Sequence, residues 1–85
     1  MDKVNKQFIN GMQSELDRKK LDYGGKDNPA NYRNMSEKNL FNIIRSDIRY
    51  IDSNPLSTRE YRKKLIAIAN RCWMIWEKFE QGEQQ

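Results

Sequence analysis

The spacing of apolar residues near the end of the 85-residue chain constrains its fold more than any other sequence feature. Ser57 and Glu60 have the spacing of a capping box, in which each side chain bonds the other residue's backbone N–H. Apolar residues then recur about every 3.5 positions, as in a helix that packs along another helix. They are Tyr61, Leu65, Ile68, Cys72, Ile75 and Phe79. The pattern predicts a long final helix with one apolar seam, in which Cys72 is an inert core residue.

Two further helices are predicted upstream of this one. Ser36 is a good N-cap, and its helix should end at Asn54-Pro55, because a residue before proline avoids the helical region. The apolar stripe of this second helix is Leu40, Ile44, Ile48 and Ile51. A first helix is expected from Asp2 to Leu21, with Gly11 weakening its middle. Its stripe is Val4, Phe8, Met12 and Leu16.

These elements predict an all-α fold in a single domain, residues 1–85. It consists of an N-terminal helix (1–21), a connector (22–35) and an antiparallel helical hairpin (36–80), since a short turn must bring the last two helices side by side. Ile66, Trp73 and Trp76 lie off the seam of the final helix, so that helix is apolar on more than one face. A chain of this length buries little surface, and a homo-oligomer is therefore expected.

Composition argues against several function classes. The chain has one cysteine and no histidine, so it can form neither an internal disulfide nor a Cys/His zinc site, and it lacks the usual general base. No catalytic residue, metal or cofactor is expected. No apolar run approaches membrane-spanning length and no signal peptide opens the chain, which predicts a cytoplasmic protein without a membrane partner. The helices are too long and apolar for direct reading of DNA.

Two segments of the chain can be aligned with the metal-binding helices of one enzyme family. The all-α nucleotide pyrophosphohydrolases of the MazG type hold magnesium with acidic pairs on two helices. The segment 64–70 looks like the second of these helices, but Lys64 and Ala67 stand where the acids belong. On the preceding helix Asp47 matches one acid and Tyr50 replaces the other. A lysine among metal ligands is incompatible with that chemistry, so a shared fold would not imply the activity.

The start of the predicted hairpin resembles a second family. Residues 31–38, Asn-Tyr-Arg-Asn-Met-Ser-Glu-Lys, lead into an isoleucine-rich helix. After the turn at 54–57, the last helix opens with Arg59-Glu60 and continues through 65–69 to Trp73-Met74. Over residues 31–79 this pattern resembles phage anti-defence proteins that sequester cyclic-nucleotide alarm signals, the anti-CBASS and anti-Thoeris sponges, with Met35 in place of their usual leucine. The first helix has no matching motif, which leaves the choice of nucleotide open.

The resemblance implies a phage protein that acts in the cytoplasm of an infected bacterium. It would bind a cyclic nucleotide without cleaving it, as a homo-oligomer. Such ligands call for cations beside stacking aromatics, and the basic charge of +4 suits them. The candidate binding residues are Tyr32, Arg33, Lys26, Tyr23, Arg59, Arg62, Phe8 and Lys19. Two alternatives stay open: a protein–protein inhibitor of a host defence enzyme or effector, and a catalytically dead nucleotide-binding protein of the MazG type.

Overall fold

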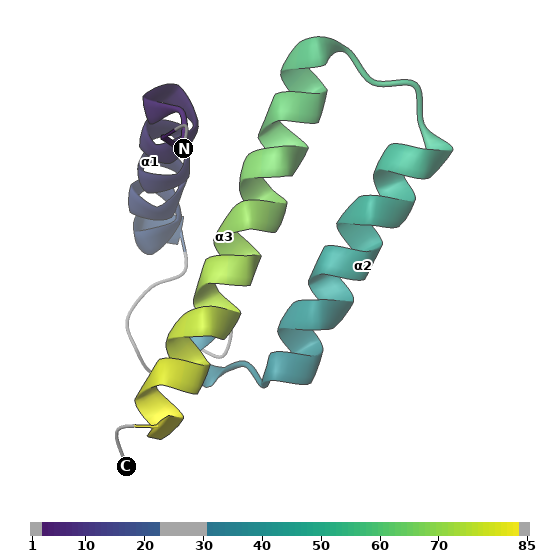
Figure 1. Ribbon diagram of the computed structural model, residues 1–85. Coiled ribbons are helices and arrows are strands. Elements are labelled where there is room, and N and C mark those ends of the chain that lie inside the picture. The colour runs from purple at the N-terminus through teal and green to yellow at the C-terminus, as the bar shows by residue number, and fades with distance from the viewer. Residues whose placement is uncertain (1–2, 23–30, 84–85) are drawn as a thin grey trace.

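In the computed structural model every element of the described residues is a helix, which confirms the all-α part of the predicted fold class. The structure describes residues 3–22 and 31–83, and side chains within 3–19 and 31–80. Its elements are α1 (Lys6–Asp22), a single 3-10 turn η1 (Tyr32–Asn34), α2 (Glu37–Ser53) and α3 (Thr58–Glu83). In Figure 1, α3 stands between α1 and α2, and α2 and α3 run side by side in opposite directions. No helix in the described ranges is long and apolar enough to span a membrane.

The caps expected for the last two helices form. Ser36 Oγ accepts a hydrogen bond from the Asn39 N–H at 3.1 Å, at the start of α2. Ser57 and Glu60 form the reciprocal capping box, with the Glu60 N–H 3.2 Å from Ser57 Oγ and the Ser57 N–H 3.3 Å from Glu60 Oε1. These contacts satisfy N–H groups that a helix start would otherwise leave without a partner. The start of each helix is thus set by residues within four positions of it.

The first helix begins later than expected. Asn5 Oδ1 accepts a hydrogen bond from the Gln7 N–H at 2.7 Å, and α1 starts at Lys6 rather than near Asp2. Val4 therefore precedes the helix and is 65% exposed. Asparagine competes well for the capping position because its short side chain reaches the free N–H groups.

Few of the side chains that the structure describes are fully enclosed. The buried hydrophobic residues are Leu40, Met74 and Ile75. Leu16, Tyr32, Met35, Ile44 and Trp73 pack around them while partly exposed. The core thus lies between the first half of α2 and the second half of α3, and it is closed by η1 and the middle of α1.

The expected seam of α3 is not its buried face. Cys72 is exposed, so the prediction that it is an inert core residue is wrong. Tyr61, Leu65 and Phe79, from the same seam, are 40%, 52% and 57% exposed. The helix is covered instead on the side of Asn70 and Met74, and Ile75 is the one seam residue that is buried. Helical periodicity shows which residues share a face, but it does not show which face the neighbouring helices cover.

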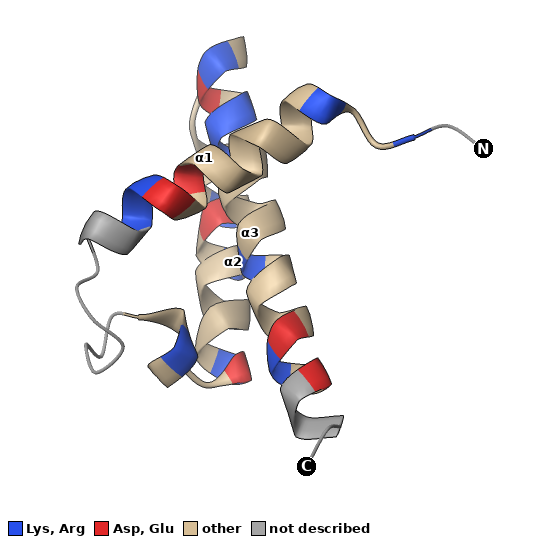
Figure 2. Cartoon of the chain, turned by 90° about the vertical axis from the view of Figure 1, so that its left-hand side faces the viewer, with Lys and Arg blue, Asp and Glu red and all other residues tan. Residues whose placement is uncertain are grey.

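Gly11 and Asn70 mark a close approach of α1 to α3. A Cβ atom on Gly11 would lie 2.6 Å from Ile66 Cδ1, so the missing side chain lets the two helices meet. One turn further along α3, the buried Asn70 donates from Nδ2 to the carbonyl oxygen of Met12, at 3.2 Å. In Figure 2, α1 crosses the α2–α3 pair obliquely, with most of its charges in its second half. These two contacts hold the crossing in place.

The pairing of Glu15 with Arg18 in α1 predicts that the folded chain loses stability at acidic pH. Glu15 lies 2.5 Å from Arg18 Nη2, and this hydrogen bond holds the pKa of Glu15 below its ordinary value of 4.5. The ionised carboxylate therefore stabilises the folded chain above about pH 4.5, and this contribution is lost as pH falls through the lower folded pKa. Glu15→Gln should shrink the difference between the free energies of unfolding at pH 7 and pH 3, measured by urea denaturation. Asp52→Asn, at an exposed carboxylate, is the control; an equal change in both variants would contradict the assignment to Glu15.

Candidate functional site

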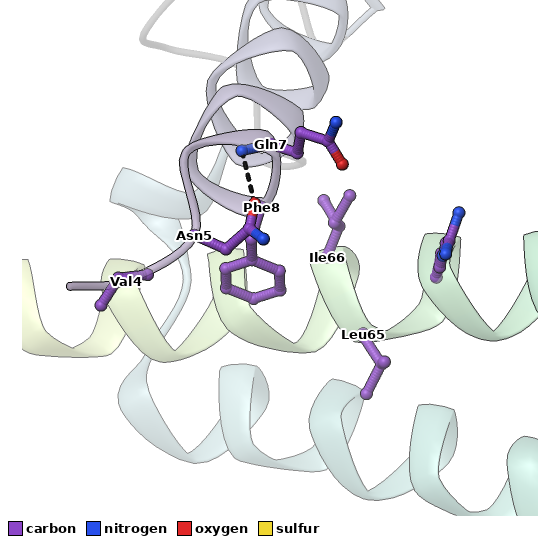
Figure 3. A pocket seen from close by; sticks show the side chains of 7 residues that line it. Val4, Asn5, Gln7, Phe8, Leu65 and Ile66 are labelled. Carbon is purple, nitrogen blue, oxygen red and sulfur yellow. Dashed lines mark hydrogen bonds between the residues drawn. The ribbon is translucent and has the colours of Figure 1, made fainter. Parts of the chain in front are cut away.

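An open groove lies between the start of α1 and the first half of α3. Its volume is about 440 Å³, within the range of roughly 300–1,000 Å³ that small-molecule sites occupy. Seven residues line it: Val4, Asn5, Gln7, Phe8, Arg62, Leu65 and Ile66. Figure 3 shows the ring of Phe8 directed from α1 toward α3, beside Ile66. Phe8 and Arg62, both candidate residues, thus meet in one groove although 54 positions separate them in the sequence.

The groove combines apolar and polar groups. Phe8 is 37% exposed, so part of its ring is open to a ligand, and Leu65 and Ile66 extend the apolar floor. Arg62 is exposed and forms no ion pair with any described residue. The side chains of Asn5 and Gln7 add amide groups that donate and accept hydrogen bonds. This chemistry suits an anion that also carries a planar or apolar part.

Tyr32 and Arg33 lie elsewhere, against the second half of α3. The Tyr32 ring packs on Trp73 with centroids 5.8 Å apart and an interplanar angle of 53°. The Arg33 guanidinium carbon lies 4.9 Å from the centroid of the same ring. Lys78 Nζ donates to the Arg33 carbonyl oxygen at 3.2 Å. Burial raises the pKa of the Tyr32 phenol above its ordinary value. The ring is thus engaged within the chain rather than open on both faces.

The other candidate residues do not join either group. Arg59 is exposed in the first turn of α3, outside the lining of the groove. Lys19 lies in the second half of α1, with its Nζ 4.0 Å from Glu15 Oε1. Tyr23 and Lys26 lie outside the described residues. The structure thus brings together Phe8 and Arg62 in one place and Tyr32 and Arg33 in another.

Three residues that stand where MazG-type enzymes have magnesium ligands lie close together between α2 and α3: Asp47, Tyr50 and Lys64. Lys64 Nζ lies 3.1 Å from Asp47 Oδ1 and 4.6 Å from the centroid of the Tyr50 ring. The side chains of Lys64 and Asp47 are 31% and 16% exposed, so the pair is partly withdrawn from water. The ammonium group of Lys64 thus occupies the position beside Asp47 where a metal ion would have to bind. Within the described part of the chain, no group of three or more histidine, cysteine or acidic side chains could hold a metal ion.

Sequence reasoning missed five residues of the groove, which were not among the candidate binding residues: Val4, Asn5, Gln7, Leu65 and Ile66. Leu65 was instead assigned to the apolar seam. The one available signal was the mid-helix Gly11, since such a glycine often marks a close approach of a second element. Comparison with known proteins adds no further guide, because no family model, curated protein or solved structure matches the chain.

Proposed function

We propose that this protein is a non-enzymatic binding protein that takes up a cyclic nucleotide in the groove between α1 and α3. The observation that carries the proposal is the meeting of Phe8 and Arg62 in a groove of about 440 Å³. A cyclic nucleotide offers a purine face for the phenylalanine ring and a phosphate for the arginine. The amides of Asn5 and Gln7 suit the remaining polar edges of such a ligand.

The biological role we propose is sequestration of an immune messenger in a phage-infected bacterium. The support is the resemblance of residues 31–79 to anti-CBASS and anti-Thoeris sponges, together with a net charge of +4 that attracts anions. The groove uses α1, the part of the chain that the resemblance does not cover. The proposed ligand class therefore rests on the chemistry of the groove as well as on the resemblance.

Substitutions in the groove should weaken nucleotide binding without unfolding the chain. Phe8→Ala removes a stacking surface worth roughly 1–3 kcal/mol, or about 5- to 150-fold in affinity. Arg62→Ala removes a charge-assisted hydrogen bond worth roughly 1.5–3 kcal/mol, or about 10- to 150-fold. Calorimetry with cyclic dinucleotides, cyclic trinucleotides and a cyclic ADP-ribose compound measures the effect, and circular dichroism checks folding. Ligand released by heating after incubation should be chemically intact.

Arg59→Ala is the matched control, because it removes the same charge from an exposed position one turn away, outside the groove. It should lower affinity by less than about threefold, through long-range attraction alone. If Arg59→Ala or Arg33→Ala weakens binding and Phe8→Ala and Arg62→Ala do not, the groove is the wrong site. Recovery of a hydrolysed nucleotide would contradict the non-enzymatic proposal itself.

A second candidate function is inhibition of a host defence protein by direct contact. The observation that favours it is the exposure of large apolar residues on α3, above all Trp76 at 64% and Phe79 at 57%. A surface of this kind suits a protein partner. This candidate predicts that none of the nucleotides binds and that the purified protein is a monomer with the surface free. A dead MazG-type protein would instead bind a nucleotide near Asp47 and Lys64, so Lys64→Ala, rather than Arg62→Ala, would lower affinity.

A further inference from the structure

Three cationic side chains follow one another along one side of α3. Lys64, Arg71 and Lys78 are spaced by seven residues, or about two helical turns, so they start from nearly the same side of the helix, roughly 10 Å apart. Lys64 Nζ lies 3.1 Å from Asp47 Oδ1, and Lys78 Nζ lies 3.2 Å from the Arg33 carbonyl oxygen. Among the residues that the structure describes, Arg71 Nη1 is buried and has no hydrogen-bond partner. The middle cation therefore differs from the two that flank it.

The register of the helix pair places an apolar side chain opposite Arg71. The helices α2 and α3 run side by side in opposite directions (Figure 1), so a step forward along α3 is matched by a step back along α2. Position 71 lies midway between 64 and 78, and position 40 lies midway between 47 and 33, the positions that the two lysines contact. The residue opposite Arg71 is therefore Leu40, which is 0% exposed. Its side chain carries no atom that could accept a hydrogen bond from the guanidinium.

The nearest acidic residues do not supply the negative charge either. Asp47 already pairs with Lys64. Glu37 is exposed in the first turn of α2, and Glu77 lies about 120° around α3 from Arg71. Within the described ranges, the ion pairs are made by Glu15 and Asp47, and none of them reaches Arg71.

An arginine in this setting favours an anion over a neutral partner. The guanidinium stays charged at every ordinary pH, and its planar donors match two oxygens of one oxyanion. Arg71 as a whole is only partly exposed, so its side chain reaches solvent while one of its nitrogens is enclosed. Enclosure strengthens a charge-assisted hydrogen bond, because little water competes for the donor. Asn70 Oδ1, a second buried atom without a partner in the described chain, is an acceptor and does not attract an anion.

We infer that Arg71 binds a small oxyanion of the phosphate type at the boundary between α2 and α3. Lys64 and Lys78 add positive potential on both sides of it, which favours phosphate, with up to two negative charges, over a carboxylate with one. The site is separate from the groove. Nine residues, or half a turn beyond two full turns, separate Arg71 from Arg62, so the two arginines lie on opposite sides of α3. The inference therefore holds whether or not the groove takes a nucleotide.

Thermal unfolding of the full chain tests the site, with inorganic phosphate compared with chloride at equal ionic strength. The wild type should melt roughly 5–10 °C higher when phosphate is at about ten times its dissociation constant. Arg71→Met keeps a long side chain without the charge, and it should gain only the small increase that phosphate gives to proteins in general. Arg49→Met removes the same charge from an exposed position of α2 and, as the matched control, should keep the wild-type gain.

The melting temperatures in chloride add a readout that a purely structural role would not produce. Arg71→Met should melt no earlier than the wild type there, because it replaces a partly buried, unpaired cation with an apolar side chain. If Arg71 only supports the fold, the variant should melt earlier in both solutions, and the inference falls. An equal gain from phosphate in the wild type and in Arg71→Met would also overturn it.

NMR of the arginine side-chain N–H groups keeps the test valid if Arg71→Met does not fold. The Arg71 Nε–H signal of the wild type, assigned by its absence from Arg71→Lys, should shift with added phosphate until the site saturates. A saturating shift of the Arg62 signal with none of the Arg71 signal would place the phosphate in the groove and overturn the inference. Because nucleotide binding is tested by Phe8→Ala and Arg62→Ala, the proposed function and this site can fail independently.

Discussion

Tyr32→Ala is expected to lower the free energy of unfolding by roughly 2–3 kcal/mol, somewhat less than truncation of a fully buried aromatic residue costs. The ring packs on Trp73 and on the core around Leu40 and Met74, so its removal opens a cavity beside a very small core. Arg33 also loses the ring on which its guanidinium lies. Urea denaturation followed by tryptophan fluorescence measures the change, since Trp73 lies against the ring.

The variant Tyr32→Phe separates the contribution of ring packing to stability from that of the phenol hydroxyl group. It keeps the ring against Trp73 and should stay within about 1 kcal/mol of the wild type. Burial raises the pKa of the Tyr32 phenol, so above about pH 10 the folded wild type keeps a proton that the unfolded chain releases. Wild-type stability should therefore decline with rising pH in that range, and less so in Tyr32→Phe. A Tyr32→Ala variant as stable as the wild type would show that the ring adds nothing to the core.

This expectation differs from the one that the sequence alone supports. A tyrosine in a connector beside an arginine is typical of a ligand-binding loop, and its removal would then leave stability unchanged. The structure places Tyr32 in a 3-10 turn whose N-cap is Asn31, with Asn31 Oδ1 3.0 Å from the Arg33 N–H. The turn directs the ring onto Trp73, 41 residues away in the sequence. The position of Tyr32 in a connector therefore did not indicate that its ring is partly buried, because that burial depends on Trp73, which is distant in the sequence.

The predictions from local sequence succeeded because their causes are local. Ser36 and the pair Ser57 and Glu60 cap α2 and α3 through side chains that reach backbone groups three residues away. The starts of α2 and α3 could therefore be predicted from a few neighbouring residues in the sequence. Asn5 acts in the same way, and because it caps α1 the helix begins at Lys6 rather than near Asp2, as the apolar spacing alone predicts.

Contacts between helices could not be predicted in the same way. The approach of Gly11 to Ile66 and the hydrogen bond from Asn70 to Met12 each join positions more than 50 residues apart. The polar Asn70 among apolar neighbours indicates that its side chain needs a hydrogen-bond partner, but the sequence does not show that this partner is the Met12 carbonyl. These two contacts place α1 along the groove that holds Phe8 and Arg62. The candidate site thus depends on the part of the fold that the sequence reveals least.

Leu40→Ala should be the most damaging single truncation in α2, with a loss of roughly 2–5 kcal/mol. Leu40 is 0% exposed and lies at the centre of a core whose other buried apolar residues are Met74 and Ile75. A domain of this length is stable by only about 4–13 kcal/mol, so the loss is a large share of the total. The midpoint of thermal unfolding should fall by at least about 10 °C. Calorimetric or circular-dichroism melting curves measure the shift.

Phe41→Ala is the matched control, because it changes the neighbouring residue and removes more atoms. Phe41 is 44% exposed, so its truncation should cost much less than that of Leu40. Its melting temperature should therefore fall by only a small part of the drop expected for Leu40→Ala. If Phe41→Ala costs as much as Leu40→Ala, the core extends to the face that the structure leaves exposed.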